Sequence, residues 1–98
     1  MEDNFSKEIS ELGSRLSQIN KDAFLVYSPI VEELIHSGRK EAQEIDHLLD
    51  RLIDFACDEN CLILFKKVCL YYWDIDKNAT AWHINAYREM WDSEDEVE

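Results

Sequence analysis

The feature of this chain that most restricts its fold is the scarcity of residues that break helices. Its 98 residues include only two glycines and one proline. An all-β domain needs a turn roughly every 8–12 residues, and those turns are rich in Gly, Pro, Asn and Asp. A helical bundle needs only a few breaks, and hydrophobic residues make up 46% of the chain. We therefore expect an all-α fold, a compact antiparallel bundle of four to five helices.

Length and charge set the expected domain organisation. A chain of this length fits one domain, which we place at residues 1–91. Residues 92–98 are expected to form an acidic disordered tail, because five of the seven are acidic and negative charge is unfavourable at a helix C-terminus. The net charge of −12 argues against direct binding of nucleic acid or anionic membranes, which both require a basic surface.

Cellular location is inferred from what the sequence lacks. The N-terminus carries no signal-like apolar run, and the apolar stretch 61–73 contains Lys66 and Lys67 and is too short to span a bilayer. The three cysteines do not form the pattern of a disulfide framework, which is typical of a reducing compartment. We therefore expect a cytoplasmic protein.

The N-terminal region has apolar residues at alternating steps of four and three. These residues are Phe5, Ile9, Leu12, Leu16, Ile19, Ala23 and Val26. The pattern fits a coiled-coil seam with a second copy, and it also fits one helix that packs on its own core. Three heptads without a charge pattern at the flanking positions are short for a coiled coil. We therefore expect this helix to pack on its own core.

Two breaks are expected in the first half of the chain. The residue before proline avoids the α region, so Ser28-Pro29 should end the first helix and begin a short second one. Gly38 is the expected C-terminal cap of that second helix. A third, strongly amphipathic helix is predicted from about residue 40 to residue 56.

The second half of the chain contains a polar turn and two further helices. Asp58-Glu59-Asn60 supplies the next turn or cap. Residues 61–73 are apolar in nearly all directions of a helix, which is typical of a central, buried helix. A last helix is predicted over about 79–91, capped by Asp76 or Asn78, with its Trp residues packed against the fourth helix.

Several motifs resemble metal sites but fail a physical test. Two Glu-x-x-His pairs, at Glu33 and Glu44, have the spacing of di-iron bundles but point away from the predicted core. The segment that begins at Asp74 lacks the Gly and Glu that an EF-hand requires. Cys57 and Cys61 have no second ligand pair for zinc. We therefore expect no metal, no cofactor and no catalytic residues.

Two features remain as candidates for binding. The first is a ridge of carboxylates at i, i+4 spacing, formed by Asp46, Asp50, Asp54 and Asp58. Like charges at this spacing destabilise a helix. The ridge is therefore either a binding surface or a solvated helix face. The second is a crowd of aromatic residues near the C-terminus, from which we select Tyr72, Trp73, Trp82 and Trp91 as partner-binding residues.

These features predict a non-enzymatic protein-interaction or regulatory module with an acidic helix face and an aromatic contact patch. The expected partner is a protein with a basic surface, and a homodimer is a further expected form. The alternative is an acidic nucleic-acid mimic that inhibits a DNA- or RNA-binding protein. The sequence favours no enzymatic activity, because no phosphate-binding loop or nucleophile motif is present.

Overall fold

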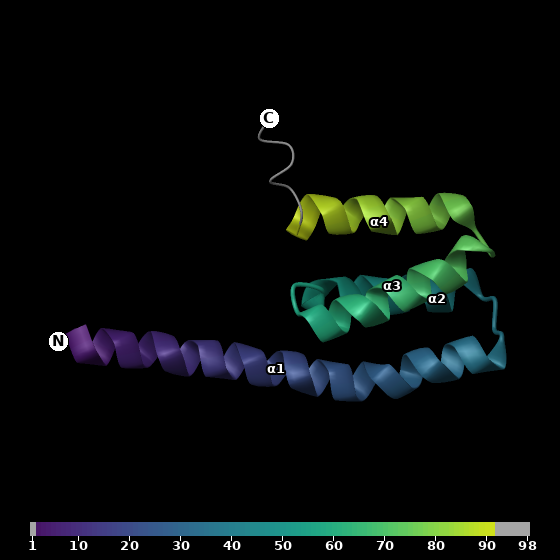
Figure 1. Ribbon diagram of the computed structural model, residues 1–98. Helices are drawn as coiled ribbons and strands as arrows, with labels where there is room; N and C mark the ends of the chain where they lie inside the picture. The colour runs from purple at the N-terminus through teal and green to yellow at the C-terminus, as the bar shows by residue number, and fades with distance from the viewer. Residues whose placement is uncertain (1, 92–98) are drawn as a thin grey trace.

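The computed structural model describes residues 2–91, and every regular element in this range is helical (Figure 1). The elements are α1 (Glu2–Ser37), α2 (Ala42–Leu52), the 3₁₀ turn η1 (Ile53–Phe55), α3 (Glu59–Trp73) and α4 (Lys77–Trp91). Four helices pack against one another, and consecutive helices run in opposite directions (Figure 1). The all-helical prediction is confirmed, whereas the predicted tail 92–98 lies outside the described residues.

The first helix is continuous through Pro29, which corrects the predicted break at Ser28-Pro29. A proline inside a helix removes one hydrogen bond and crowds the preceding turn, and the helix can accommodate this by bending. Figure 1 shows that α1 changes direction in its C-terminal part. The helix ends at Ser37, and Gly38 caps it as expected, with φ at 72° and its N–H donating to the Leu34 carbonyl at 3.2 Å.

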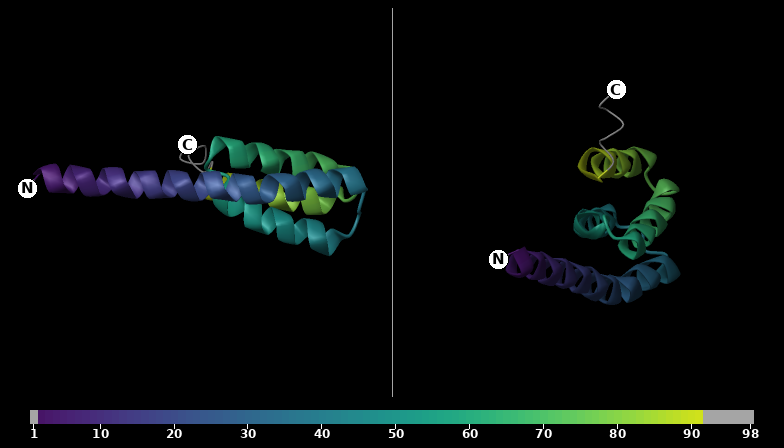
Figure 2. Two further views of the ribbon diagram at one scale, coloured as in Figure 1. Left: turned by 90° about the horizontal axis from the view of Figure 1, so that it is seen from below. Right: turned by 60° about the vertical axis from the view of Figure 1, so that its left-hand side comes forward.

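The N-terminal part of α1 projects beyond the other helices (Figure 2). At 1.5 Å per residue, its 36 residues span roughly 54 Å and the 15 residues of α3 only about 22 Å. The beginning of α3 meets α1 near Asn20, whose carbonyl accepts from Cys61 Sγ at 3.6 Å. Residues 7–19, here called the arm, therefore pack on no other helix. This corrects the expectation that the whole first helix packs on its own core.

The core lies around α3, which contacts each of the other three helices. The largest fully buried side chains of the core come from α1, α2 and α3. They are Leu34, Ile45, Leu49, Leu52, Leu64 and Tyr72. The central position predicted for this helix is confirmed. One side of α3 nevertheless remains open, because Ile63 and Leu70 are exposed.

Side chains of two aspartates determine where α3 and α4 begin. Asp58 Oδ2 accepts from the N–H groups of Asn60 and Cys61, both at 3.1 Å. Asp76 Oδ1 accepts from the Ala79 N–H at 3.1 Å, which confirms the predicted cap. These bonds satisfy donors that a helix N-terminus otherwise leaves unpaired.

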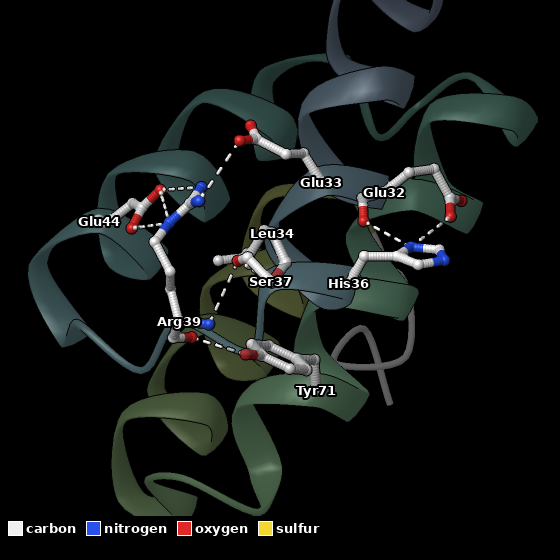
Figure 3. A network of polar contacts seen from close by, with 8 residues as sticks. All are labelled: Glu32, Glu33, Leu34, His36, Ser37, Arg39, Glu44 and Tyr71. Atoms are coloured by element: carbon white, nitrogen blue, oxygen red, sulfur yellow. Dashed lines mark hydrogen bonds and ion pairs between the residues drawn. The ribbon is translucent and has the colours of Figure 1, made fainter.

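The connection between α1 and α2 is held by a polar network around Arg39 (Figure 3). The Arg39 guanidinium donates to Glu44 at 2.8 and 3.1 Å and to Glu33 at 3.4 Å. The Arg39 carbonyl accepts from the Tyr71 hydroxyl at 2.6 Å, which ties this connection to α3. The hydrogen-bonded Glu44 carboxylate raises the pKa of Arg39, and Arg39 lowers the pKa of Glu44.

The last helix packs through a different face from the one expected. Its buried residues are Thr80 and His83, while Trp82 is 64% exposed. Adjacent residues in a helix lie about 100° apart, so burial of His83 turns Trp82 outward. Trp91 lies beside η1, where its Nε1 donates to the Ile53 carbonyl at 2.7 Å. The prediction that the Trp residues of this helix pack on the fourth helix is therefore corrected.

Candidate functional site

Two of the four predicted ridge aspartates converge on a histidine of another helix. Asp46 and Asp50 lie one turn apart on α2, and both face His83 of α4. Nε2 of His83 lies 2.9 Å from Asp46 Oδ1, and its Nδ1 lies 3.8 Å from Asp50 Oδ1. The His83 side chain is only 4% exposed, whereas that of Asp50 is 60% exposed. His83 thus attaches α2 to α4 and leaves the Asp50 carboxylate accessible to a partner.

The exposed Trp82 stands beside this carboxylate pair. Asp46, Asp50, Ala79, Trp82 and His83 line a shallow cavity of about 260 Å³, here called the α2–α4 notch. The Trp82 ring meets the His83 ring edge-on, at 89° and 5.1 Å between centroids. Trp82 is 64% exposed, so an exposed aromatic ring and a carboxylate line the same cavity.

The other two ridge aspartates do not continue this surface. The α-helix ends at Leu52, so the i, i+4 ridge predicted for a single helix stops after Asp50. Asp54 lies exposed in the 3₁₀ turn, and Asp58 is used as the N-terminal cap of α3. The single ridge of four carboxylates is therefore corrected to a pair on α2 and two separately placed acids.

The four predicted aromatic residues are also placed separately. Tyr72 is fully buried, so it does not contribute to a contact surface. Trp73 is exposed and carries the Lys77 ammonium over its ring, at 5.6 Å from the centroid. Trp82 lines the notch, and Trp91 is bonded to η1. Among these four residues of the described range 2–91, Trp82 is the one that lines a cavity with Asp46 and Asp50.

Tyr72 occupies an unusual position for a polar side chain. Within residues 2–91, its hydroxyl has no hydrogen-bond partner. Burial raises the pKa of Tyr72 to about 12, and the Asp46 carboxylate contributes to this rise. The hydroxyl is therefore neutral near pH 7 and out of reach of solvent.

A second cavity lies between α3 and α4. It has a volume of about 530 Å³ and is lined mainly by apolar side chains, among them Leu62, Phe65 and Ile84. Lys66 and Arg88 also line it, so its charged groups are cationic. This groove was missed by the sequence analysis, since it depends on how two helices lie side by side.

The described residues hold no cluster suited to a metal ion. In the part of the chain that the structure describes, no three His, Cys, Asp or Glu side chains are placed to hold one. Glu33 and Glu44, which resembled di-iron ligands, bind Arg39 instead (Figure 3). Burial raises the pKa of Cys61 to about 11 and that of Cys69 to about 12, so these thiols are poor nucleophiles at neutral pH.

Comparisons with known proteins do not place the chain in a family. No family model, no curated protein and no solved structure matches it. Within residues 2–91, none of the helices combines the length and the apolar character needed to cross a bilayer.

Proposed function

We propose that the protein is a non-enzymatic interaction module that binds a basic segment of a partner protein at the α2–α4 notch. The observation that carries this proposal is the position of Trp82 beside Asp46 and Asp50. A cation over the face of Trp is attracted by the ring, and a carboxylate at hydrogen-bonding distance adds a charge-assisted bond. Arginine combines both interactions, because its planar guanidinium stacks on aromatic rings and pairs with carboxylates.

The charge of the chain supports a basic partner. The net charge of −12 attracts basic surfaces over a long range and speeds their association. The notch then supplies a defined contact, since Trp is among the residues that most often dominate binding energy. His83 holds Asp46 in place, so the binding site is preorganised in the free protein.

An Arg-rich peptide is the probe for this proposal, and a peptide with citrulline in place of Arg is its neutral control. We expect calorimetric titration to show binding of the Arg-rich peptide that weakens with salt, and much weaker binding of the citrulline peptide. Asp50→Asn and Trp82→Ala should each weaken binding roughly tenfold or more, the loss of one charged or aromatic contact.

Asp54→Asn is the matched control, because Asp54 is an exposed acid of the same segment outside the notch. It should change affinity by less than about threefold, the effect of a remote surface charge. If Asp50→Asn and Trp82→Ala both bind the Arg-rich peptide as the native protein does, the proposal is wrong.

The nucleic-acid mimic remains the second proposal, and the same variants distinguish it. A mimic presents many carboxylates to a basic groove, so Asp54→Asn should weaken binding as much as Asp50→Asn does. The geometry favours the notch over a mimic, because Asp58 is engaged as a helix cap and Asp46 by His83.

A further inference from the structure

The helix α1 carries two apolar stripes, and only one of them packs on its own chain. The first stripe is covered by the other helices and includes Ala23, Val31 and Leu34. The second stripe, here called the outer stripe, is exposed at all of its large apolar residues and is interrupted only by Ala23, which the other helices cover. It consists of Ile9, Leu12, Leu16, Ile19, Val26 and Ile30.

The outer stripe continues past the point where the other helices begin. Val26 and Ile30 belong to the part of α1 that packs on α3, yet both remain exposed. From Ile9 to Ile30 the stripe is about 32 Å long, and its residues occupy the a and d positions of heptads. A projecting helix with serines and a glycine is marginal in water without a packed face. The outer stripe thus has the form of one half of a helix–helix interface.

Local charge indicates what covers the outer stripe. The chain carries a net charge of −12, but residues 7–31 contain three acidic and three basic residues. Two copies of such an acidic chain repel each other over most of their surface. Along this segment they can meet without that repulsion, which favours a second copy as the occupant.

The charges flanking the stripe indicate the orientation of the second copy. One flank carries Glu8, Arg15 and Asp22 at intervals of seven residues, which corrects the expectation that the flanking positions have no charge pattern. The corresponding positions of the other flank are uncharged in the sequence, and Asn20 is one of them. In a parallel pair the charged flank of one copy would meet the uncharged flank of the other. In an antiparallel pair the charged flank of one copy meets the charged flank of the other.

The alternating sign of these charges also selects a register. When Leu16 packs against the partner's Ile19, Arg15 of each copy lies opposite the partner's Asp22. A shift by one heptad in either direction places Arg15 opposite the partner's Arg15, or Asp22 opposite the partner's Asp22. Such like-charge contacts disfavour the shifted pairings.

We propose that two copies of this chain pair through the outer stripes of their α1 helices, in antiparallel orientation, with Arg15 of each copy against the partner's Asp22. This pairing is a two-fold symmetric interface, in which the same surface of each copy is used. It covers both arms and leaves the α2–α4 notch of each copy outside the pairing surface.

Sedimentation equilibrium of the full chain tests whether the outer stripe pairs. The native protein should be a dimer at micromolar concentration, and Leu16→Ser should raise the dimer dissociation constant roughly a hundredfold, since two leucines per dimer are lost. Leu25→Ser is the matched control, because Leu25 is a 68% exposed leucine of the same helix outside the outer stripe. A native protein that is monomeric at every concentration would overturn the proposal.

Charge exchange tests the orientation and the register. Arg15→Asp and Asp22→Arg should each weaken the dimer roughly tenfold, and the double variant should restore native affinity. A dimer unaffected by either single variant, or not rescued by the double variant, overturns the antiparallel register. A dimer broken instead by Lys66→Glu or Arg88→Glu would place the arm in the α3–α4 groove, and this outcome would also overturn the proposal.

Discussion

The two halves of α1 have the same kind of apolar spacing but opposite surroundings. In the C-terminal half, Leu34 is 1% exposed, whereas Leu12 in the arm is 57% exposed. Both leucines lie on regular turns of one helix, so the difference does not arise from local conformation. It arises because α3 reaches only as far as Asn20. An apolar face read from a sequence therefore does not show whether the same chain covers it.

The same comparison separates the two proposed binding surfaces. The arm is locally neutral and apolar, which suits a second copy and gives a contact that salt affects little. The notch on α2 and α4 combines a carboxylate with an aromatic ring, which suits a basic partner and gives a salt-sensitive contact. Because the two surfaces lie on different helices, self-association and partner binding can occur together.

The largest effect is expected from one substitution made in both halves of α1. Leu34→Ala should lower the free energy of unfolding by about 2–5 kcal/mol, because it opens a cavity in the core. Leu12→Ala should change it by less than about 0.5 kcal/mol, as is usual for surface sites. Urea unfolding of both variants in a Leu16→Ser background measures these differences without a contribution from pairing.

The stability of Leu12→Ala also tests whether the arm is exposed in solution. If Leu12→Ala lowers the free energy of unfolding as much as Leu34→Ala does in that background, the arm packs on its own chain in solution. The outer stripe is then covered without a second copy.

The second effect is a loss of stability at alkaline pH, which should arise from two buried cysteines. Cys61 and Cys69 ionise with an ordinary pKa of 9.0 in the unfolded chain, and burial raises these values to about 11 and about 12 in the folded protein. Stability from these groups is fully present below pH 9 and is lost as pH rises from 9 through 11 to 12. Each group should lower the free energy of unfolding by up to about 1.4 kcal/mol per pH unit in this window.

Urea unfolding at pH 8 and pH 10.5 measures this dependence. Cys69→Ala should make it smaller, and Cys57→Ala, which removes an exposed thiol, should leave it unchanged. An equal loss of stability in the native protein and in Cys69→Ala would show that the Cys69 thiol does not contribute to the alkaline effect.

Local sequence patterns predicted most of the fold. The caps at Gly38 and Asp76 depend only on neighbouring residues, and both were predicted. Pro29 was misjudged because the cost of a proline in a helix can be offset by packing on both sides of it, and packing is not a local property. The extent of the arm was missed for the same reason, since it depends on the relative lengths of α1 and α3.

The candidate site was predicted in part. The acidic spacing identified Asp46 and Asp50, and aromatic crowding identified Trp82. His83, which joins them, was not predicted as a site residue, although Thr80, His83 and Tyr87 at steps of three and four indicate the buried face of α4. The continuous ridge through Asp58 failed because α2 ends at Leu52, and a helix end of this kind has no sequence signal as clear as glycine or proline.

The smallest effect is expected from the hydroxyl groups of two neighbouring tyrosines of α3, of which one has a hydrogen-bond partner and the other has none among the described residues. The Tyr71 hydroxyl donates to the Arg39 carbonyl at 2.6 Å, so Tyr71→Phe should lower the free energy of unfolding by about 1 kcal/mol. The fully buried Tyr72 hydroxyl has no such partner within residues 2–91, so Tyr72→Phe should leave stability unchanged or raise it by up to about 1 kcal/mol. Thermal unfolding of the two variants compares them directly. A loss in Tyr72→Phe as large as that in Tyr71→Phe would mean that Asp46 accepts from Tyr72 in solution, and that this carboxylate is divided between the core and the notch.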